Sequence, residues 1–225
     1  MVLRNEKCWY KEVCTKDSCD NCIRFEEMQY LMNHSGIPTN RQKPQKLFAE
    51  VDYEQFIELT HIKSHIVDFV DMGNNLYICS KETGNGKTSW AIKILLKYFD
   101  EIWAGNGFNI RGYFIHVPTL LTFLKDFGNP DMQEMRNTII KTDLLVWDDI
   151  AATKMSDYDL SQVTILLDGR INEGKSNIFT SNLTEVSELQ KMLGDRLTSR
   201  IWNCSKIIEF KGKDRRAYGS TSDTE

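Results

Sequence analysis

The chain has 225 residues, of which 41% are hydrophobic and 27% are charged, and its formal net charge is −4. This composition suits one domain of ordinary size with a small appendage, and it excludes a chain-wide basic field for gripping DNA. No apolar stretch is long enough to span a bilayer, and residues 1–7 lack the apolar core of a signal peptide. We therefore expect a cytoplasmic protein without a membrane partner.

The first 34 residues are rich in cysteine, with Cys8, Cys14, Cys19 and Cys22 close together. A reducing cytoplasm disfavours disulfides, and four thiolates in so short a segment suit a tetrahedral zinc site that replaces a hydrophobic core. Only the last two form a Cys-x-x-Cys pair, so an iron–sulfur cluster and unliganded thiols stay open as alternatives. His34 could replace one of the cysteines as a ligand, although a lone histidine before a linker is more often a solvated residue. We predict a zinc-binding segment over residues 1–34, with a helix at 23–32.

The rest of the chain separates into three parts by composition. Residues 35–47 are polar and contain Pro38 and Pro44, which predicts a linker. Residues 48–216 alternate apolar runs with helical patterns, and the polar tail 217–225 is expected to be disordered. Strands are predicted at 76–79, 113–117, 144–147, 177–180 and 207–210, and helices at 88–98, 118–127, 132–141, 158–171 and 193–202. This alternation predicts an α/β fold with a five-stranded, mostly parallel sheet flanked by helices.

A phosphate-binding loop is predicted directly after the first strand, in the run Thr83-Gly84-Asn85-Gly86-Lys87-Thr88-Ser89. Glycine-flanked backbone N–H groups followed by a helix N-terminus form an anion site. Lys87 would reach the β- and γ-phosphates of ATP, and the Thr88 hydroxyl would ligate Mg²⁺. Lys81 stands where the usual motif has its first glycine, so we expect a different turn at residues 80–81.

Polar residues end the third and fourth predicted strands. The carboxyl edge of an open α/β sheet is where ligands bind, so Asp148 is predicted to hold Mg²⁺ and Asp149 to polarise the attacking water. The side-chain amide of Asn182 could orient that water, although an asparagine after a strand is more often a turn residue. These residues together predict ATP hydrolysis.

In this order the elements resemble the AAA+ ATPases, and within them the DnaC-type helicase loaders and the IstB-type transposition helpers. The likeness covers about residues 35–216 and rests on Ser35-Gly36-Ile37-Pro38, residues 172–183, residues 193–201 and Gly212-Lys213-Asp214-Arg215-Arg216. It implies a P-loop AAA+ (ASCE) core and makes Asn182 the sensor residue.

The arginine-bearing stretch 193–201 is the most discriminating part of this likeness. Arg196 and Arg200 are four residues apart and so share one helix face. The resemblance implies that Arg200 reaches the ATP of a neighbouring subunit, with Arg196 as a structural or interface partner. Two solvated arginines near Asp195 are the alternative.

The resemblance further implies a loader that places a hexameric replicative DNA helicase on single-stranded DNA. It would assemble into an ATP-dependent oligomer, hydrolyse ATP slowly at the subunit interfaces, and contact the helicase through residues 1–34. Lys125, Arg136 and Lys141 are candidate DNA phosphate contacts. An IstB-like transposition helper and a stand-alone P-loop enzyme remain alternatives. The cytoplasm would be that of a bacterium, or of a bacterial host if a phage encodes the chain.

Overall fold

The structure is a computed structural model that describes residues 8, 14–15, 19–42, 47, 51–126 and 131–213. In this part of the chain, five strands form one sheet in the order β2-β3-β4-β1-β5, and all four pairings are parallel. The strands are β1 (Asn75–Cys79), β2 (Gly112–His116), β3 (Leu144–Asp148), β4 (Ser176–Ser181) and β5 (Ser205–Glu209). The predicted fold class is confirmed.

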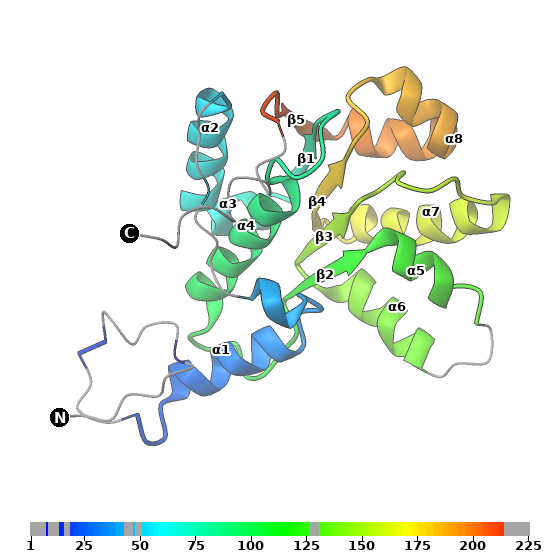
Figure 1. The fold of residues 1–225 in the computed structure, drawn as a ribbon. Coiled ribbons are helices and arrows are strands. Elements are labelled where there is room, and N and C mark those ends of the chain that lie inside the picture. Colours follow the sequence, from blue (N-terminus) through cyan, green and yellow to red (C-terminus); the bar gives the residue numbers. More distant parts are fainter. Residues whose placement is uncertain are drawn as a thin grey trace.

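Helices cover both faces of the sheet (Figure 1). On one side lie α1 (Ile23–Asn33), α2 (Tyr53–Ser64), α3 (Ile66–Asp71) and α4 (Lys87–Ile102). On the other side lie α5 (Val117–Phe123), α6 (Asp131–Lys141), α7 (Asp157–Asn172) and α8 (Val186–Trp202). A short 3-10 helix, η1 (Thr39–Arg41), follows α1. Within the described residues, no helix is both long and apolar enough to cross a membrane.

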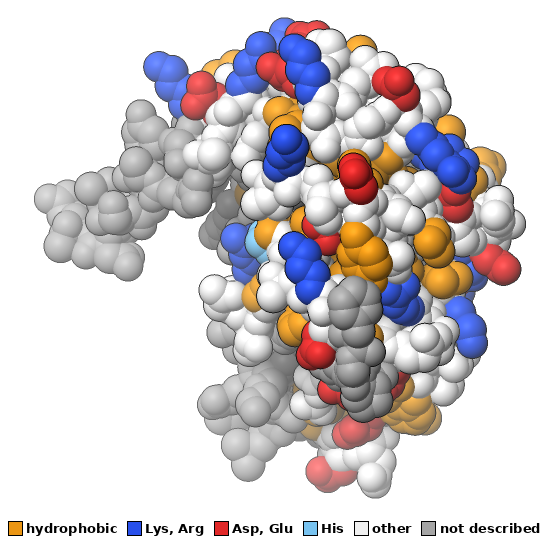
Figure 2. All heavy atoms as spheres, turned by 90° about the vertical axis from the view of Figure 1, so that its right-hand side faces the viewer, with side chains coloured by type: hydrophobic (Ala, Val, Ile, Leu, Met, Phe, Trp, Pro, Cys, Tyr) orange, Lys and Arg blue, Asp and Glu red, His pale blue; other side chains and the backbone are white. Residues whose placement is uncertain are grey.

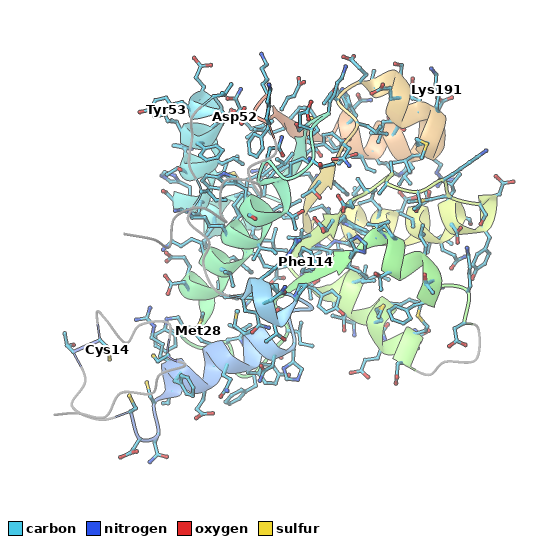
Figure 3. All side chains as sticks on the ribbon, in the orientation of Figure 1. Cys14, Met28, Asp52, Tyr53, Phe114 and Lys191 are labelled. Carbon is cyan, nitrogen blue, oxygen red and sulfur yellow. The ribbon has the colours of Figure 1, made fainter. Side chains whose placement is uncertain are left out.

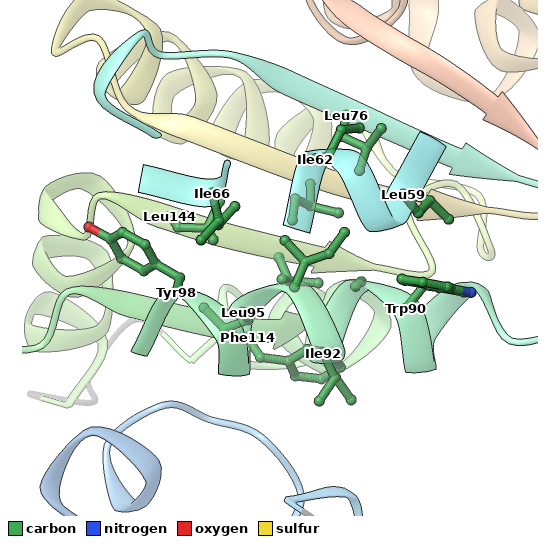
Figure 4. Close-up of a cluster of buried hydrophobic side chains, with 14 of the residues drawn as sticks. Leu59, Ile62, Ile66, Leu76, Trp90, Ile92, Leu95, Tyr98, Phe114 and Leu144 are labelled. Atoms are coloured by element: carbon green, nitrogen blue, oxygen red, sulfur yellow. The ribbon is translucent and has the colours of Figure 1, made fainter. Parts of the chain in front are cut away.

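Successive strand residues point to opposite faces, so each strand contributes to two cores. Leu76 and Ile78 of β1 pack toward α4, where Leu95 is fully buried, and Figure 4 shows part of this cluster. Tyr77 of β1 and Trp147 of β3 belong to the second core, beneath α5 to α8. Burial on both faces explains why these strands read as continuous apolar runs.

The observed helices differ from the predicted ones by more than two residues in four places. Helix α4 continues to Ile102, four residues beyond the predicted end. Helices α2 and α3 were not predicted, because the exposed Tyr53 and Ile57 weaken the apolar periodicity of α2. Helix α5 ends at Phe123 rather than at residue 127, since the backbone there tightens into i→i+3 hydrogen bonds. Helix α8 begins at Val186 and is kinked at Gly194, whose φ of 73° is outside the helical range.

The start of the predicted linker is packed against the edge strand β2. Ser35 and Ile37 are buried, and the Ser35 carbonyl accepts a hydrogen bond from the Phe114 N–H at 2.6 Å. Gly36 has φ of 70°, and a Cβ there would lie 2.3 Å from the Phe114 carbonyl oxygen. The domain limits at residues 34, 47 and 216 stay predictions, and the tail 217–225 lies outside the described residues.

A buried arginine ties together the amino-terminal ends of β3 and β4. Arg170 of α7 is fully buried. Its guanidinium donates to the carbonyls of Ile139, Thr142 and Ser176 at 2.5, 2.8 and 2.5 Å, and to Asn177 Oδ1 at 2.6 Å. Burial lowers the pKa of Arg170 to about 9 while the nearby Asp143 raises it, so the group is cationic at neutral pH. These bonds connect α7 with α6, with Thr142 in the link between α6 and β3, and with β4.

Candidate nucleotide-binding site

The predicted phosphate loop connects β1 to the N-terminus of α4. Gly84 has φ of 68°, and Gly86, directly before the helix, has φ of 102°. Both values lie in the left-handed region that favours glycine. The first N–H groups of a helix have no partner inside the helix, so a loop that ends in this way forms a cradle for an anion.

Ser80 builds the turn at the point where Lys81 replaces the usual glycine. Its hydroxyl is buried and accepts hydrogen bonds from the Glu82 N–H at 3.1 Å and from Asn85 Nδ2 at 2.5 Å. Lys81 is exposed and is not among the described non-glycine residues with positive φ. A serine-centred turn therefore guides the chain off β1 without the left-handed residue that glycine would supply.

The Lys87 ammonium lies inside the loop. Lys87 is only 5% exposed, and its Nζ donates to the Glu82 carbonyl at 2.8 Å and to Asn85 Oδ1 at 3.4 Å. Asn85 is itself buried and donates to the Gly212 carbonyl at 3.3 Å. The cation is thus held by oxygen acceptors that phosphate oxygens can replace.

The predicted magnesium ligands lie against one another. Asp148 ends β3 and is 4% exposed, and its Oδ1 accepts a hydrogen bond from Thr180 at 2.8 Å. Burial raises the pKa of the Asp148 carboxyl, while hydrogen bonding with Thr88 and Thr180 lowers it, and the net shift is upward. A buried carboxylate beside a helix-terminal hydroxyl fits a hard cation such as Mg²⁺.

Asp149 directly follows β3 and contacts two residues that were not predicted as part of the site, Thr180 and His116. Its φ is 56°, its N–H donates to Thr180 Oγ1 at 2.9 Å, and its carboxylate lies 3.6 Å from His116 Nε2. His116 ends β2, and Thr180 lies near the end of β4. Each is a polar residue at the carboxyl end of a strand, which is the signal that could have identified it. Asn182 follows β4 at this edge with an exposed side chain.

The two predicted interface arginines lie on the sheet face opposite α4, not in the phosphate loop (Figure 1). Arg196 donates to Asp168 of α7 at 3.0 Å, and Arg200 pairs with the other oxygen of the same carboxylate. Their side chains are 71% and 33% exposed. Beside them, Leu160 and Ile165 line a groove between α7 and α8. One carboxylate therefore holds both arginines at the surface.

The candidate DNA contacts have protein partners or stand exposed. Lys125 lies 3.6 Å from Asp159, Arg136 donates to Gln162 at 2.7 Å, and Lys141 is exposed. Figure 2 shows the side of the molecule that carries α5 to α8, with basic and acidic side chains interspersed on the visible surface. DNA contact by these residues stays a prediction.

The zinc site also stays a prediction. Cys8, Cys14, Cys19 and Cys22 are each partly buried, and Figure 3 labels Cys14 on the side of the molecule where α1 lies. Cys22 is the residue directly before α1. Much of the chain between the first three cysteines lies outside the described residues.

We expect purified protein to carry about one zinc ion per chain by elemental analysis. The double variant Cys19→Ser with Cys22→Ser should lose that ion, because two of its four ligands are removed. Cys204→Ser is the control, since Cys204 is exposed after α8 and should retain the metal. Metal-free protein with four titratable N-terminal thiols would contradict the prediction.

Comparison with known proteins adds a family match and a fold match. A family model described as "IstB-like ATP binding protein" matches residues 26–220. A search of curated proteins finds no match.

Three solved structures illustrate the fold match. The chain is similar to a structure titled "Crystal structure of the DnaC helicase loader", with TM-score 0.64 and 21% identity over 77% of this chain and 100% of that one. A structure titled "Crystal Structure of the DnaI" has TM-score 0.62 and 22% identity over 78% of this chain and 95% of that one. A structure of the replication initiator DnaA bound to AMPPCP and single-stranded DNA has TM-score 0.56 and 17% identity over 75% of this chain and 49% of that one. This chain therefore spans about half the length of that DnaA chain. At these identities the likeness shows the fold.

Proposed function

Because the chain belongs to the IstB-like, DnaC-type family of AAA+ ATPases, we propose that it is an ATP-dependent loader of a hexameric replicative DNA helicase onto single-stranded DNA. The observation that supports this most directly is the fold match to DnaC, which extends over that whole chain, combined with the Gly-Lys-Thr end of the phosphate loop at the N-terminus of α4. The work would take place in the cytoplasm of a bacterium, including one infected by a phage that encodes the chain.

In this proposal each residue of the site has a role. The loop from Thr83 to Ser89 would hold the phosphates, with Lys87 placed against the β- and γ-phosphate oxygens. Thr88 and Asp148 would hold Mg²⁺, which neutralises charge on those oxygens. Asp149, the residue directly after β3, would polarise the attacking water, and Asn182 at the same edge of the sheet would orient it.

Assembly would complete the site. The exposed face of α8 carries Arg200, whose guanidinium would meet the γ-phosphate of the neighbouring subunit, with Arg196 as its interface partner. The groove beside Arg200, which has both apolar and charged lining residues, offers contact area for that neighbour. Hydrolysis in an ATP-dependent oligomer would be stimulated by partners, and it would be slow because Lys81 replaces a glycine and Asp149 is shorter than glutamate. Residues 1–34 would contact the helicase.

A transposition helper is the second candidate function, and the description of the matching family model favours it. Such a helper should bind a transposase and not a hexameric helicase. A stand-alone P-loop enzyme would instead be fully active as a monomer. A binding measurement with the purified replicative helicase of the organism that encodes the chain distinguishes a helicase loader, which should bind it, from a transposition helper, which should not.

Lys87→Ala is expected to weaken ATP binding by about a hundredfold, because it leaves the phosphates without their buried cation. ATP-dependent deposition of the helicase on single-stranded DNA should be lost in parallel. Titration with a fluorescent ATP analogue and a helicase unwinding assay measure the two effects.

Lys97→Ala is the matched control for this experiment. Lys97 lies on the same helix, but its ammonium pairs with Asp100 and Glu101 at a partly exposed position, where such pairs contribute little. It should bind ATP normally. Unchanged affinity in Lys87→Ala would refute the phosphate-loop assignment, and helicase loading that needs no ATP would refute the proposed function.

A further inference from the structure

Three metal-binding side chains meet at the carboxyl edge of the sheet. Ligand atoms of His116, Asp148 and Asp149 all lie within 4.8 Å of one another. In the described part of the chain, no other three His, Cys, Asp or Glu side chains come this close together. The parallel register of β2 and β3 places His116 directly beside Asp148. The cluster therefore depends on strand pairing and not on a local sequence motif.

The imidazole is oriented as a metal ligand would be. His116 Nδ1 lies 3.0 Å from Thr119 Oγ1, and with its proton on Nδ1 the ring directs the lone pair of Nε2 toward Asp149. A second hydrogen bond of this kind fixes Asp148, whose Oδ1 accepts from Thr180. Ligating histidines and carboxylates are commonly held by such outer partners.

The spacing suits an ion more than a direct hydrogen bond. His116 Nε2 and Asp149 Oδ2 are 3.6 Å apart, which is too long for a good N–H···O bond. Two atoms that each lie about 2.1 Å from one ion are at most about 4.2 Å apart, so both can bind the same ion without a backbone shift. The neighbouring carboxylates of Asp148 and Asp149 repel each other, and a cation between them relieves that repulsion.

We propose that the nucleotide-free chain binds one divalent first-row transition-metal ion through His116, Asp148 and Asp149. Imidazole suits Fe²⁺, Ni²⁺, Cu²⁺ and Zn²⁺, and the two carboxylates suit Mn²⁺ as well, whereas Mg²⁺ takes oxygen ligands almost exclusively. The inference rests on the proposed function for the role of Asp148, and it adds an ion that engages Asp149 as a ligand. In that state the Asp149 carboxylate is not available to polarise water, so the transition-metal form is distinct from the Mg²⁺–ATP form.

Mn²⁺ alone is the probe that tests this site in the full chain. Thiolates favour softer ions, so the N-terminal cysteines should not retain Mn²⁺. Electron paramagnetic resonance counts the free Mn²⁺ in a titration without nucleotide. We expect one bound ion in the wild type and an affinity at least about tenfold lower in His116→Asn. His61→Asn is the control, since His61 lies exposed on α2, and it should bind as the wild type does.

A second measurement does not depend on the variant. Bound Mn²⁺ should broaden the imidazole NMR signals of His116 and spare those of His61 and His65. Equal Mn²⁺ affinity in His116→Asn, or equal broadening of all histidines, would overturn the proposal. A wild type that binds Mg²⁺–ATP through Lys87 but no Mn²⁺ refutes the metal site alone. A chain that binds Mn²⁺ at His116 but no ATP refutes the proposed function and leaves the metal site standing.

Discussion

Arg200→Ala is expected to lower ATP hydrolysis in the assembled protein by about a thousandfold, with ATP binding close to normal. The guanidinium carries a fixed charge that would meet the negative charge developing on the γ-phosphate across a subunit boundary. The Arg200 side chain on α8 pairs with Asp168 of α7 and is one-third exposed, so the guanidinium can be reached by a neighbouring subunit. Helicase loading should fail together with hydrolysis. Phosphate release measures the loss of hydrolysis, and a nucleotide titration of the same variant shows whether ATP binding is retained.

Mixing of variants tests whether Arg200 acts in trans. Arg200→Ala combined with Asp149→Asn should recover part of the hydrolysis, because some mixed interfaces pair an intact acidic site with an intact arginine. Lys191→Ala is the control on the same helix, where Lys191 is exposed (Figure 3), and should behave as the wild type. Full activity from strictly monomeric protein at high dilution would contradict the prediction and favour a stand-alone P-loop enzyme.

Arg170→Met is expected to destabilise the fold by about 3–5 kcal/mol. The variant keeps much of the side-chain volume but leaves the buried carbonyls of Ile139, Thr142 and Ser176 without their donor. That loss is a large part of the about 5–15 kcal/mol by which a domain is usually stable. Urea unfolding followed by circular dichroism measures it as a lower midpoint at an unchanged slope.

Arg136→Met is the control for this loss. Arg136 is only partly buried and makes a side-chain bond to Gln162, so its removal should change stability by less than about 1 kcal/mol. Equal midpoints for Arg170→Met and Arg136→Met would show that the buried network contributes little.

The sequence predicts the phosphate loop and the acidic strand because both signals are local. Gly84, Gly86 and Lys87 lie within four residues, and Asp148 and Asp149 end an apolar run that reads as a buried strand. The parallel sheet is predictable for the same reason, since strands covered on both faces lack polar alternation. The roles assigned to these residues in catalysis remain proposals.

The rest of the site depends on contacts between distant parts of the chain. Thr180 meets Asp148, and His116 meets Asp149, only because β2, β3 and β4 are neighbours in one register. Asp168 is one of several acidic residues on helices, and its partnership with both arginines appears only when α7 and α8 pack together. The strand-end positions of His116 and Thr180 mark them as site candidates in the sequence, but single-sequence patterns carry no information on strand order, so the pairings themselves could not be predicted.

The contact between Ser35 and Phe114 has a consequence for the solubility of the chain. Strand β2 is at the edge of the sheet, and an edge presents unpaired N–H and C=O groups on which strands of other molecules can add. The Ser35 carbonyl accepts a hydrogen bond from one of these donors, the Phe114 N–H. Gly36, with its left-handed backbone, bends the chain so that it stays close to β2. Residues 35–37 thus cover part of the open edge of β2 against intermolecular β-pairing, and a shortened chain that lacked them is expected to be more prone to aggregate.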